Sequence, residues 1–169
     1  MREKHFYTYT IVPVLTQEDR QEYSRVLQNA NLRMEKKGIR QWKEELLQPE
    51  IVFAGDPSGY MALHRGKAAA VCYITETDPL FWRGYEEEPA LYVHKLACRE
   101  EYAGKGAAQA LLRFCAEKAR QEGKCFLRLA CRAAQPKLRA VYEKMGFSYA
   151  GIAEIPSLGL VDALYEIRL

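Results

Sequence analysis

The chain has 169 residues, of which 49% are hydrophobic and 28% are charged, a balance typical of one soluble globular domain spanning residues 1–169. The formal net charge is only +3, and Lys and Arg are scattered among Asp and Glu, which argues against a nucleic-acid-binding protein. No stretch is long and apolar enough to span a membrane, and the N-terminus lacks the apolar segment of a signal peptide. We therefore expect a cytoplasmic protein.

The cysteine pattern favours buried thiols over disulfides or a metal site. The count of five is odd, and no pair has the spacing of metal ligands. All lie in apolar stretches: Cys72, Cys98, Cys115, Cys125 and Cys131. We predict small buried thiols in a reducing compartment and no bound metal, with Cys98 partly exposed.

The N-terminal part begins with a predicted strand and a long predicted helix. Residues 6–14 are rich in Tyr, Thr, Ile and Val, which favour β-strands. Thr16 and Asp19 have the spacing of a helix N-cap, and apolar residues recur at helical spacing from residue 17 to residue 36. Gly38 is expected to end this helix.

A second helix and a hairpin are predicted next. Residues 40–47 have the pattern of a shorter helix that is stopped near Pro49. Residues 60–64 and 68–75 have the composition of strands, and a short turn with a glycine joins them. This arrangement predicts a β-hairpin.

A polar loop, residues 76–89, follows the hairpin. Its 14 residues make it long for a compact domain, and such loops are disproportionately functional. Its acidic run at residues 86–88 is expected to form a solvated face.

The second half alternates strands and helices. The expected strands are 91–98, 125–131, 147–155 and 163–168, and the expected helices are 109–122 and 136–145. With the first half, this order predicts an α/β fold with a mixed central sheet of about six to seven strands flanked by about four helices. Antiparallel pairs come first and strand–helix–strand crossovers later.

The turn between strand 91–98 and the following helix has the features of an anion-binding site. It contains two glycines, Gly104 and Gly106, among small residues that let the backbone approach a ligand. The unpaired N–H groups and the dipole of the helix start favour a phosphate group. The glycine spacing fits neither a P-loop nor a dinucleotide fingerprint, and a plain tight turn is the alternative.

The segments on both sides of this turn also match the motifs of one protein family. Ala103, Gly106 and Ala108 map onto an R/Q-x-x-G-x-G/A motif, residues 93–98 match the strand before it, and residues 138–147 match a Y-E-K-x-G-F ending. In these segments the chain resembles the GNAT superfamily of acyl-CoA-dependent N-acetyltransferases. The resemblance covers residues 90–151, and it implies a GNAT-like fold in which this segment forms the cofactor-binding core.

The resemblance implies acetyl-CoA as the cofactor. The pantetheine arm would pair with the backbone of Leu96, Ala97 and Cys98. The pyrophosphate would lie over Ala103, Gly104, Lys105, Gly106, Ala107 and Ala108. Ala103 replaces the usual Arg or Gln, and Gln135 lies near the place where many members have Asn. Backbone N–H donors are expected to suffice at the loop, and the Gln135 amide can serve the same polar role.

Acetyl transfer to an amine needs a base, a polarised thioester and an acid. Tyr142 is the candidate acid, because a phenol stays protonated at neutral pH; packing in the core is the alternative. The candidate bases are His94 and Glu76. Period-two alternation places His94 on the same strand face as Leu96 and Cys98, and a packed, hydrogen-bonded histidine is the alternative. For Glu76 the alternative is an ordinary loop carboxylate. Direct attack needs no enzyme nucleophile, and the backbone N–H of Leu96 or Cys98 would polarise the carbonyl by family analogy.

The acceptor side is predicted from aromatic residues. Trp42, Phe81 and Trp82 suit an amine with an apolar body, and burial in the core explains them almost as well. The main hypothesis is an N-acetyltransferase for a small primary amine. The alternatives are a protein N-terminal or lysine acetyltransferase and a non-catalytic acyl-CoA sensor. A homodimer is left open.

Overall fold

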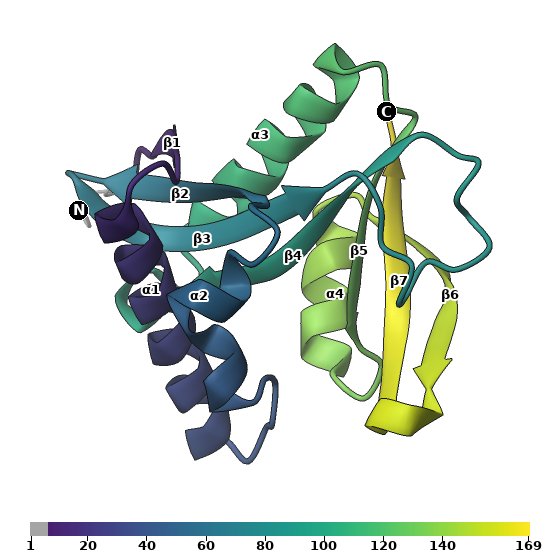
Figure 1. The fold of residues 1–169 in the computed structure, drawn as a ribbon, viewed down its shortest axis with the longest axis horizontal. Coiled ribbons are helices and arrows are strands. Elements are labelled where there is room, and N and C mark those ends of the chain that lie inside the picture. Colours follow the sequence, from purple (N-terminus) through teal and green to yellow (C-terminus); the bar gives the residue numbers. More distant parts are fainter. Residues whose placement is uncertain (1–6) are drawn as a thin grey trace, which may run out of the picture. The chain divides into compact units, whose positions relative to one another are not determined.

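A computed structural model describes residues 7–169, and Figure 1 shows the arrangement of its elements. The strands are β1 (Thr10–Pro13), β2 (Ser58–His64), β3 (Lys67–Thr75), β4 (Ala90–Cys98), β5 (Phe126–Arg132), β6 (Ser148–Ile155) and β7 (Leu160–Arg168). The α-helices are α1 (Gln17–Lys36), α2 (Pro49–Val52), α3 (Ala107–Gln121) and α4 (Pro136–Lys144). The 3-10 helices are η1 (Glu44–Leu47), η2 (Glu100–Tyr102) and η3 (Pro156–Leu158).

The seven strands form one mixed sheet in the order β1-β2-β3-β4-β5-β7-β6. β1 is antiparallel to β2, β4 is parallel to β5, and β7 is antiparallel to both β5 and β6. The parallel pair needs a crossover, which α3 supplies. Together with four α-helices in residues 7–169, this sheet confirms the expected α/β fold.

The chain packs as two compact units. Unit 1 comprises Met1–Tyr73, described from residue 7 onward, and Lys95–Leu112. Unit 2 comprises Ile74–His94 and Arg113–Leu169. β3, β4 and α3 each contribute residues to both units.

Unit 1 is built around α1, whose buried face packs against β2 and β3. Its cluster also includes residues of η1 and α2, so these helices cover the same side of the strands (Figure 1). The buried members are Val14, Tyr23, Val26, Leu27, Ala30, Leu47, Val52, Phe53, Met61, Ala68, Val71 and Ala97. The last of these brings the second half of β4 into the core of the unit.

The start of α1 is a capping box, as the sequence predicts. The Thr16 hydroxyl accepts the N–H of Asp19 at 3.1 Å, and the Asp19 carboxylate accepts the N–H of Thr16 at 2.9 Å. These bonds, the one to Thr16 first, hold the pKa of Asp19 below its usual value. The helix ends at Lys36, two residues before Gly38.

The β2–β3 hairpin is confirmed, with Arg65 and Gly66 as its two-residue turn. Both have positive φ, 50° and 80°, which is the geometry of a type I′ turn. Arg65 therefore holds a left-handed conformation that a non-glycine residue adopts only at some cost.

The predicted second helix is wrong in its position and its end. Residues 40–43 are not helical; η1 and α2 follow them, and Pro49 begins α2 instead of stopping a helix. Proline lacks only an N–H that the first helical turn leaves unpaired, so it suits this position. The predicted first strand was also too long: β1 begins at Thr10, and Phe6 lies outside the described residues.

Unit 2 packs the loop 76–89 onto its strands. Trp82, Ala90, Tyr92 and Leu164 form a buried cluster, and Phe81 and Tyr85 pack against it. Trp82 therefore anchors the loop in the core of the unit, while most of the loop residues are exposed. No helix of the described residues combines the length and the apolar character needed to cross a membrane.

The cysteine prediction is correct for four of the five thiols. Cys72, Cys115 and Cys131 are buried and Cys98 is partly buried, but Cys125 is exposed. Cys125 lies immediately before β5, where the chain has not yet entered the sheet. An apolar neighbourhood in sequence therefore did not imply burial.

Candidate active site

The predicted cofactor loop lies in unit 1, between β4 and α3. Arg99 fixes its beginning: the side chain donates to the carbonyl of Ala68 at 2.9 Å and to Glu22 at 2.6 Å. Its backbone N–H donates to the carbonyl of Ala69 at 2.9 Å, and the backbone N–H of Glu100 donates to Oδ1 of Asn29 in α1. The loop is thus attached to β3 and α1 before it reaches the glycines.

The geometry of the loop suits an anion. Gly104 and Gly106 have φ values of 69° and 88°, and open space surrounds the position of a Cβ at each. Within the described residues, the backbone N–H groups of Gly106, Ala107 and Ala108 have no acceptor. They form the start of α3, where the helix dipole also favours negative charge. The residues therefore fit a pyrophosphate held by backbone N–H groups, with no polar side chain needed at position 103.

Cys98, at the end of β4, is not an activated nucleophile. Burial raises the pKa of its thiol, and Glu101 raises it further, against an opposing effect of Arg33. The thiol donates to the carbonyl of Arg99 at 3.3 Å. A protonated thiol in this setting fits direct attack by an acceptor, because the thiolate is the reactive form.

Tyr142 lies in α4, in unit 2, and is buried. Its ring contacts Phe147 and Tyr165, with centroid distances of 5.8 and 6.2 Å. The hydroxyl of Tyr165 donates to Glu143 at 2.8 Å and accepts from Arg139 at 3.0 Å. Tyr142 is therefore rigidly packed, and its role as an acid stays a prediction.

His94 belongs to a hydrogen-bonded chain whose direction can be assigned. The hydroxyl of Thr75 lies 2.8 Å from the carbonyl of Thr77 and 2.7 Å from Nε2 of His94. A carbonyl only accepts, so the single hydroxyl proton goes to Thr77. Nε2 of His94 must then donate to Thr75, and Nδ1 is the basic nitrogen of the neutral ring.

The argument that placed His94 on one face with Leu96 and Cys98 fails. It assumed regular alternation, but Lys95 has a φ of 50°, outside the extended region. A left-handed residue within a strand breaks the alternation, as in a β-bulge. The parallel register with β5 also ends just before this point, at Val93 and Leu129.

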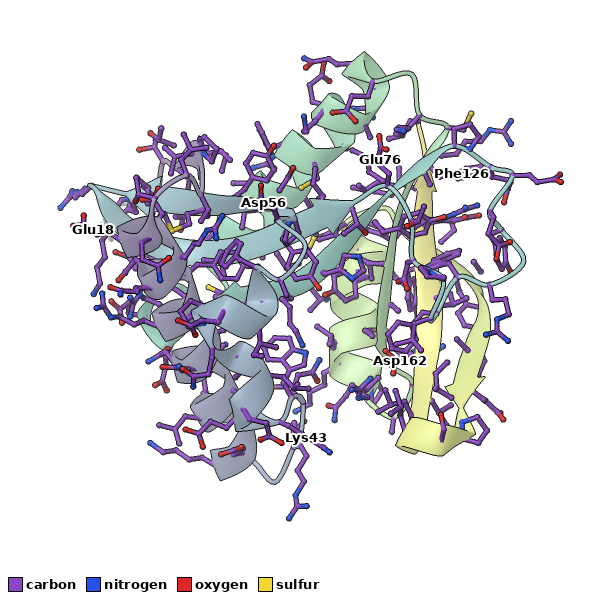
Figure 2. All side chains as sticks on the ribbon, viewed as in Figure 1. Glu18, Lys43, Asp56, Glu76, Phe126 and Asp162 are labelled. Atoms are coloured by element: carbon purple, nitrogen blue, oxygen red, sulfur yellow. The ribbon has the colours of Figure 1, made fainter. Side chains whose placement is uncertain are left out.

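Glu76 and Asp78 differ strongly in environment. Glu76 follows β3 (Figure 2), has a side chain that is 73% exposed, and pairs with Lys124 at 3.1 Å. Asp78 is buried, and burial raises the pKa of its carboxyl although the N–H groups of Phe81 and Leu80 donate to it. Of the two predicted bases, His94 is hydrogen-bonded and Glu76 is exposed and ion-paired, and the role of each stays a prediction.

The remaining predicted residues are spread over both units. In unit 2, Gln135 is the N-cap of α4 and makes no side-chain cap bond. In unit 1, Trp42 is partly buried and the Lys95 ammonium lies 5.0 Å from its ring centroid. Phe81 is partly buried, whereas Trp82 is only 1% exposed, which favours a packing role for Trp82.

Sequence reasoning missed Arg128, which is completely buried in unit 2. Its guanidinium lies between the rings of Trp82, Tyr85 and Phe126, at 4.7, 5.1 and 4.5 Å from their centroids. It pairs with Glu88 and with Glu166. Residues 86–88 are exposed, as predicted, and Glu88 in addition forms an ion pair with Arg128. No sequence pattern distinguishes this Arg from a surface one.

The comparisons with known proteins agree on one family. A model of the acetyltransferase (GNAT) family matches residues 16–147. The uncharacterized N-acetyltransferase YesJ of Bacillus subtilis is 29% identical over 77 residues, which cover 46% of this chain and 43% of that protein. The chain thus matches less than half the length of this curated relative.

Two solved structures show the same fold over nearly the whole chain. A GNAT-family acetyltransferase of Listeria monocytogenes has a TM-score of 0.73 at 17% identity, with 95% of each chain covered. A Bacillus subtilis acetyltransferase in complex with CoA has a TM-score of 0.65 at 15% identity, with 96% of this chain and 99% of that chain covered. Since the family model matches most of the sequence, the chain belongs to the GNAT family of acetyltransferases.

Proposed function

We propose that the protein transfers the acetyl group of acetyl-CoA to a primary amine of a small molecule. The observation that supports this most directly is the loop before α3. In a chain of the GNAT family, unpaired N–H groups at Gly106, Ala107 and Ala108 provide donors for a pyrophosphate. The free cysteines suit a reducing compartment, in keeping with a cytoplasmic enzyme.

The cofactor would be held by the two ends of this segment. Acetyl-CoA supplies an acetyl thioester, whose carbonyl carbon accepts the amine. The backbone of Leu96, Ala97 and Cys98 would bind the pantetheine arm, and an N–H of Leu96 or Cys98 would polarise the carbonyl. Loop residues 103–108 would bind the pyrophosphate. The B. subtilis acetyltransferase, which has the same fold, was solved in complex with CoA, and this supports CoA as the ligand.

His94 is the base that we favour. An alkyl ammonium has a pKa of about 10, so the acceptor must lose a proton before it can attack. The Thr75–Thr77 chain assigns the His94 proton to Nε2, so Nδ1 is the nitrogen that would take up the proton of the acceptor. Glu76 is the second candidate, and its exposure makes it the weaker one.

Tyr142 would donate the proton that the departing thiolate needs. Its fixed ring, between Phe147 and Tyr165, supports a positioned donor. On the acceptor side, Trp42 and Phe81 offer partly buried rings to an amine with an apolar body. The Lys95 ammonium over the Trp42 ring would repel an acceptor that carries a positive charge in addition to its reacting amine.

The test couples acetyl-CoA binding to thiol release over a panel of small primary amines. The wild type should bind acetyl-CoA and release CoA with at least one amine. Tyr142→Phe should lower kcat by about 100-fold, within the usual range for general acid catalysis, while acetyl-CoA affinity stays the same.

Tyr149→Phe is the matched control, because Tyr149 also contacts Tyr165 but is exposed. It should leave kcat unchanged. Equal kcat for Tyr142→Phe and wild type would remove Tyr142 from the mechanism. Tight acetyl-CoA binding without release for any amine or peptide would instead indicate a sensor, and release only with a peptide would indicate a protein acetyltransferase.

A further inference from the structure

Arg33 lies in the last turn of α1, in unit 1, and one of its nitrogens has no partner. Its Nη1 atom is buried, and among the described residues it makes no hydrogen bond. The guanidinium also forms no ion pair with a carboxylate of residues 7–169. A buried donor of a charged group is unfavourable without an acceptor. The fold thus leaves this cation with a donor for a group that the chain itself does not supply.

The flank of α1 that carries Arg33 faces the chain that follows β4. Glu22, Asn29 and Arg33 recur at helical spacing and therefore lie on one side of the helix. Glu22 pairs with Arg99 at 2.6 Å, and Asn29 accepts the backbone N–H of Glu100 at 3.3 Å. Arg33 continues the same flank by one further turn, so its side chain starts beside the end of β4.

Cys98 locates the positive charge of Arg33 more closely. The guanidinium opposes the rise in the pKa of the Cys98 thiol, an effect that requires the charge to lie near the sulfur. In the proposed function, residues 96–98 bind the pantetheine arm with its thioester, which is uncharged. The phosphates of CoA are assigned to loop residues 103–108. An anion that meets Arg33 would therefore come from the acceptor.

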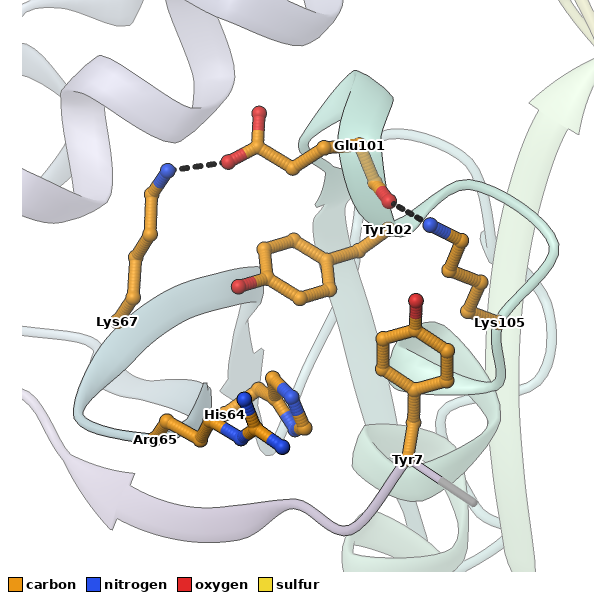
Figure 3. A pocket seen from close by; sticks show the side chains of 7 residues that line it. All are labelled: Tyr7, His64, Arg65, Lys67, Glu101, Tyr102 and Lys105. Carbon is orange, nitrogen blue, oxygen red and sulfur yellow. Dashed lines mark hydrogen bonds and ion pairs between the residues drawn. The ribbon is translucent and has the colours of Figure 1, made fainter. Parts of the chain in front are cut away.

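Carboxylates near Arg33 are already matched with other cations. Glu101, which raises the pKa of the same thiol, forms an ion pair with Lys67 (Figure 3). Glu22, on the flank of Arg33, is paired with Arg99. The positive charge of Arg33 is thus not neutralised by these two acids.

Lys95 adds a second positive charge to β4. Its ammonium lies 5.0 Å from the centroid of the Trp42 ring, which is the predicted acceptor contact of unit 1. Both Arg33 and Lys95 would therefore attract an acceptor that carries a negative charge. An acceptor with a second ammonium group would be repelled by both.

Building on the proposed acetyl transfer, on which this assignment rests, we propose that Arg33 binds a carboxylate of the acceptor. The preferred substrate is then a small primary amine that also carries a carboxylate, the chemistry of an amino acid. A planar guanidinium matches a carboxylate through two parallel N–H···O bonds. Such a group would also satisfy the unpaired Nη1 atom of Arg33.

The experiment compares acceptors that differ only in this charge. The panel holds the standard α-amino acids, β-alanine and γ-aminobutyrate, each paired with its carboxamide, and CoA release is measured. For the best pair, wild type should have a kcat/KM about 10-fold higher for the carboxylate than for the amide, mainly through KM. In Arg33→Gln this ratio should fall to about 1, because the charge-assisted contact is lost.

Lys36→Gln is the matched control, because Lys36 is an exposed cation in the same last turn of α1. It should keep the wild-type ratio. A ratio within one protein does not depend on how much of that protein is folded, so a destabilised Arg33→Gln still gives an answer. The same ratio in Arg33→Gln and Lys36→Gln, or a wild type that does not prefer the carboxylates, would overturn this role of Arg33.

A second measurement needs no turnover. Calorimetry compares binding of the N-acetyl amino acids with binding of their amides to the CoA-bound protein, in wild type and Arg33→Gln. The carboxylate should bind about 10-fold more tightly in wild type alone. Amine turnover without a carboxylate preference would refute the role of Arg33 and leave the proposed function standing. No turnover with any amine would refute the proposed function, and the calorimetry would then decide on Arg33.

Discussion

Thr75 determines which nitrogen of His94 carries the proton, and this makes a sharp test of the proposed base. Thr75→Val keeps the shape of the side chain but removes the acceptor of Nε2–H, 2.7 Å away. The proton can then move to Nδ1, so the basic nitrogen is lost in part of the molecules. We expect kcat to fall about 10-fold with unchanged acetyl-CoA affinity.

The readout that separates positioning from packing is the histidine tautomer. Nitrogen-15 NMR should show the Nε2–H form in wild type and a mixture in Thr75→Val. Thr75→Ser, which restores the hydroxyl, should restore both the tautomer and the rate. If turnover is the same in all three proteins, His94 is not the base.

Asp78 makes stability depend on pH in a direction set by its burial. Burial raises the pKa of its carboxyl, so the folded state favours the neutral form. This contribution is fully present below the unfolded pKa and is lost as pH rises through the folded pKa. Asp78→Asn removes the charge but keeps an oxygen for the N–H of Phe81. We expect its Tm at pH 7.5 to be about 2 °C above wild type.

Thermal melts between pH 3.5 and 8 check this prediction. The two proteins should have similar Tm values at the acid end and diverge as pH rises. Glu87→Gln in the same loop is the control, because Glu87 is exposed. A wild-type advantage at pH 7.5 would show that the Asp78 carboxylate stabilises the fold.

Residue-scale features were predictable where neighbours in sequence decide them. The capping box follows from Thr16 and Asp19 alone, because both partners lie within one helical turn. The left-handed Lys95 and the exposed Cys125 were not, because the chain around each gives no local signal. Their states are decided by strands that meet only after folding.

At the scale of elements, Arg128 attaches the loop 76–89 to β5 and β7. Its guanidinium donates to Glu88 and to the carbonyl of Tyr85 from the loop, and to Glu166 on β7. Arg128→Met removes the cation and leaves two carboxylates without it. Water can solvate Glu88, which is 46% exposed, and partly Glu166, so we expect a loss of about 1–3 kcal/mol in the free energy of unfolding. Chemical denaturation measures this value.

Hydrogen exchange of the loop amides should also become faster in Arg128→Met, since the loop loses its attachment. Arg83→Met, an exposed arginine in the same loop, should change neither quantity. Arg128→Lys should fall between them, because an ammonium keeps the charge but not the planar fork. Equal stability of Arg128→Met and Arg83→Met would contradict the role of Arg128.

Elements were predictable to the extent that their periodicity and turn residues are local. The hairpin followed from the glycine between two strand-like runs, and α1 from its apolar spacing. Pro49 misled because a proline that ends one helix and a proline that begins another look alike in sequence. In the loop 76–89 the burial of Trp82 was not predictable, because its partners, Arg128 among them, lie far away in the sequence.

At the scale of the whole molecule, the sequence predicted the class of the fold because element order constrains the topology strongly. The family then explains why a strand, a glycine turn and a helix occur in succession. What the order cannot supply is the division of the packing into two units, which cuts through β3, β4 and α3. The prediction of one domain over residues 1–169 therefore needs its own test.

The two tryptophans make that test direct, because Trp42 lies in unit 1 and Trp82 in unit 2. β3, β4 and α3 are continuous through both units, so unfolding of either unit must disrupt elements of the other. We expect a single cooperative transition. In Trp82→Phe the fluorescence reports unit 1, and in Trp42→Phe it reports unit 2. In each variant, the urea midpoint from fluorescence should match the midpoint from far-ultraviolet circular dichroism. A fluorescence midpoint that departs from the dichroism midpoint in either variant would show that the units unfold separately, against one domain.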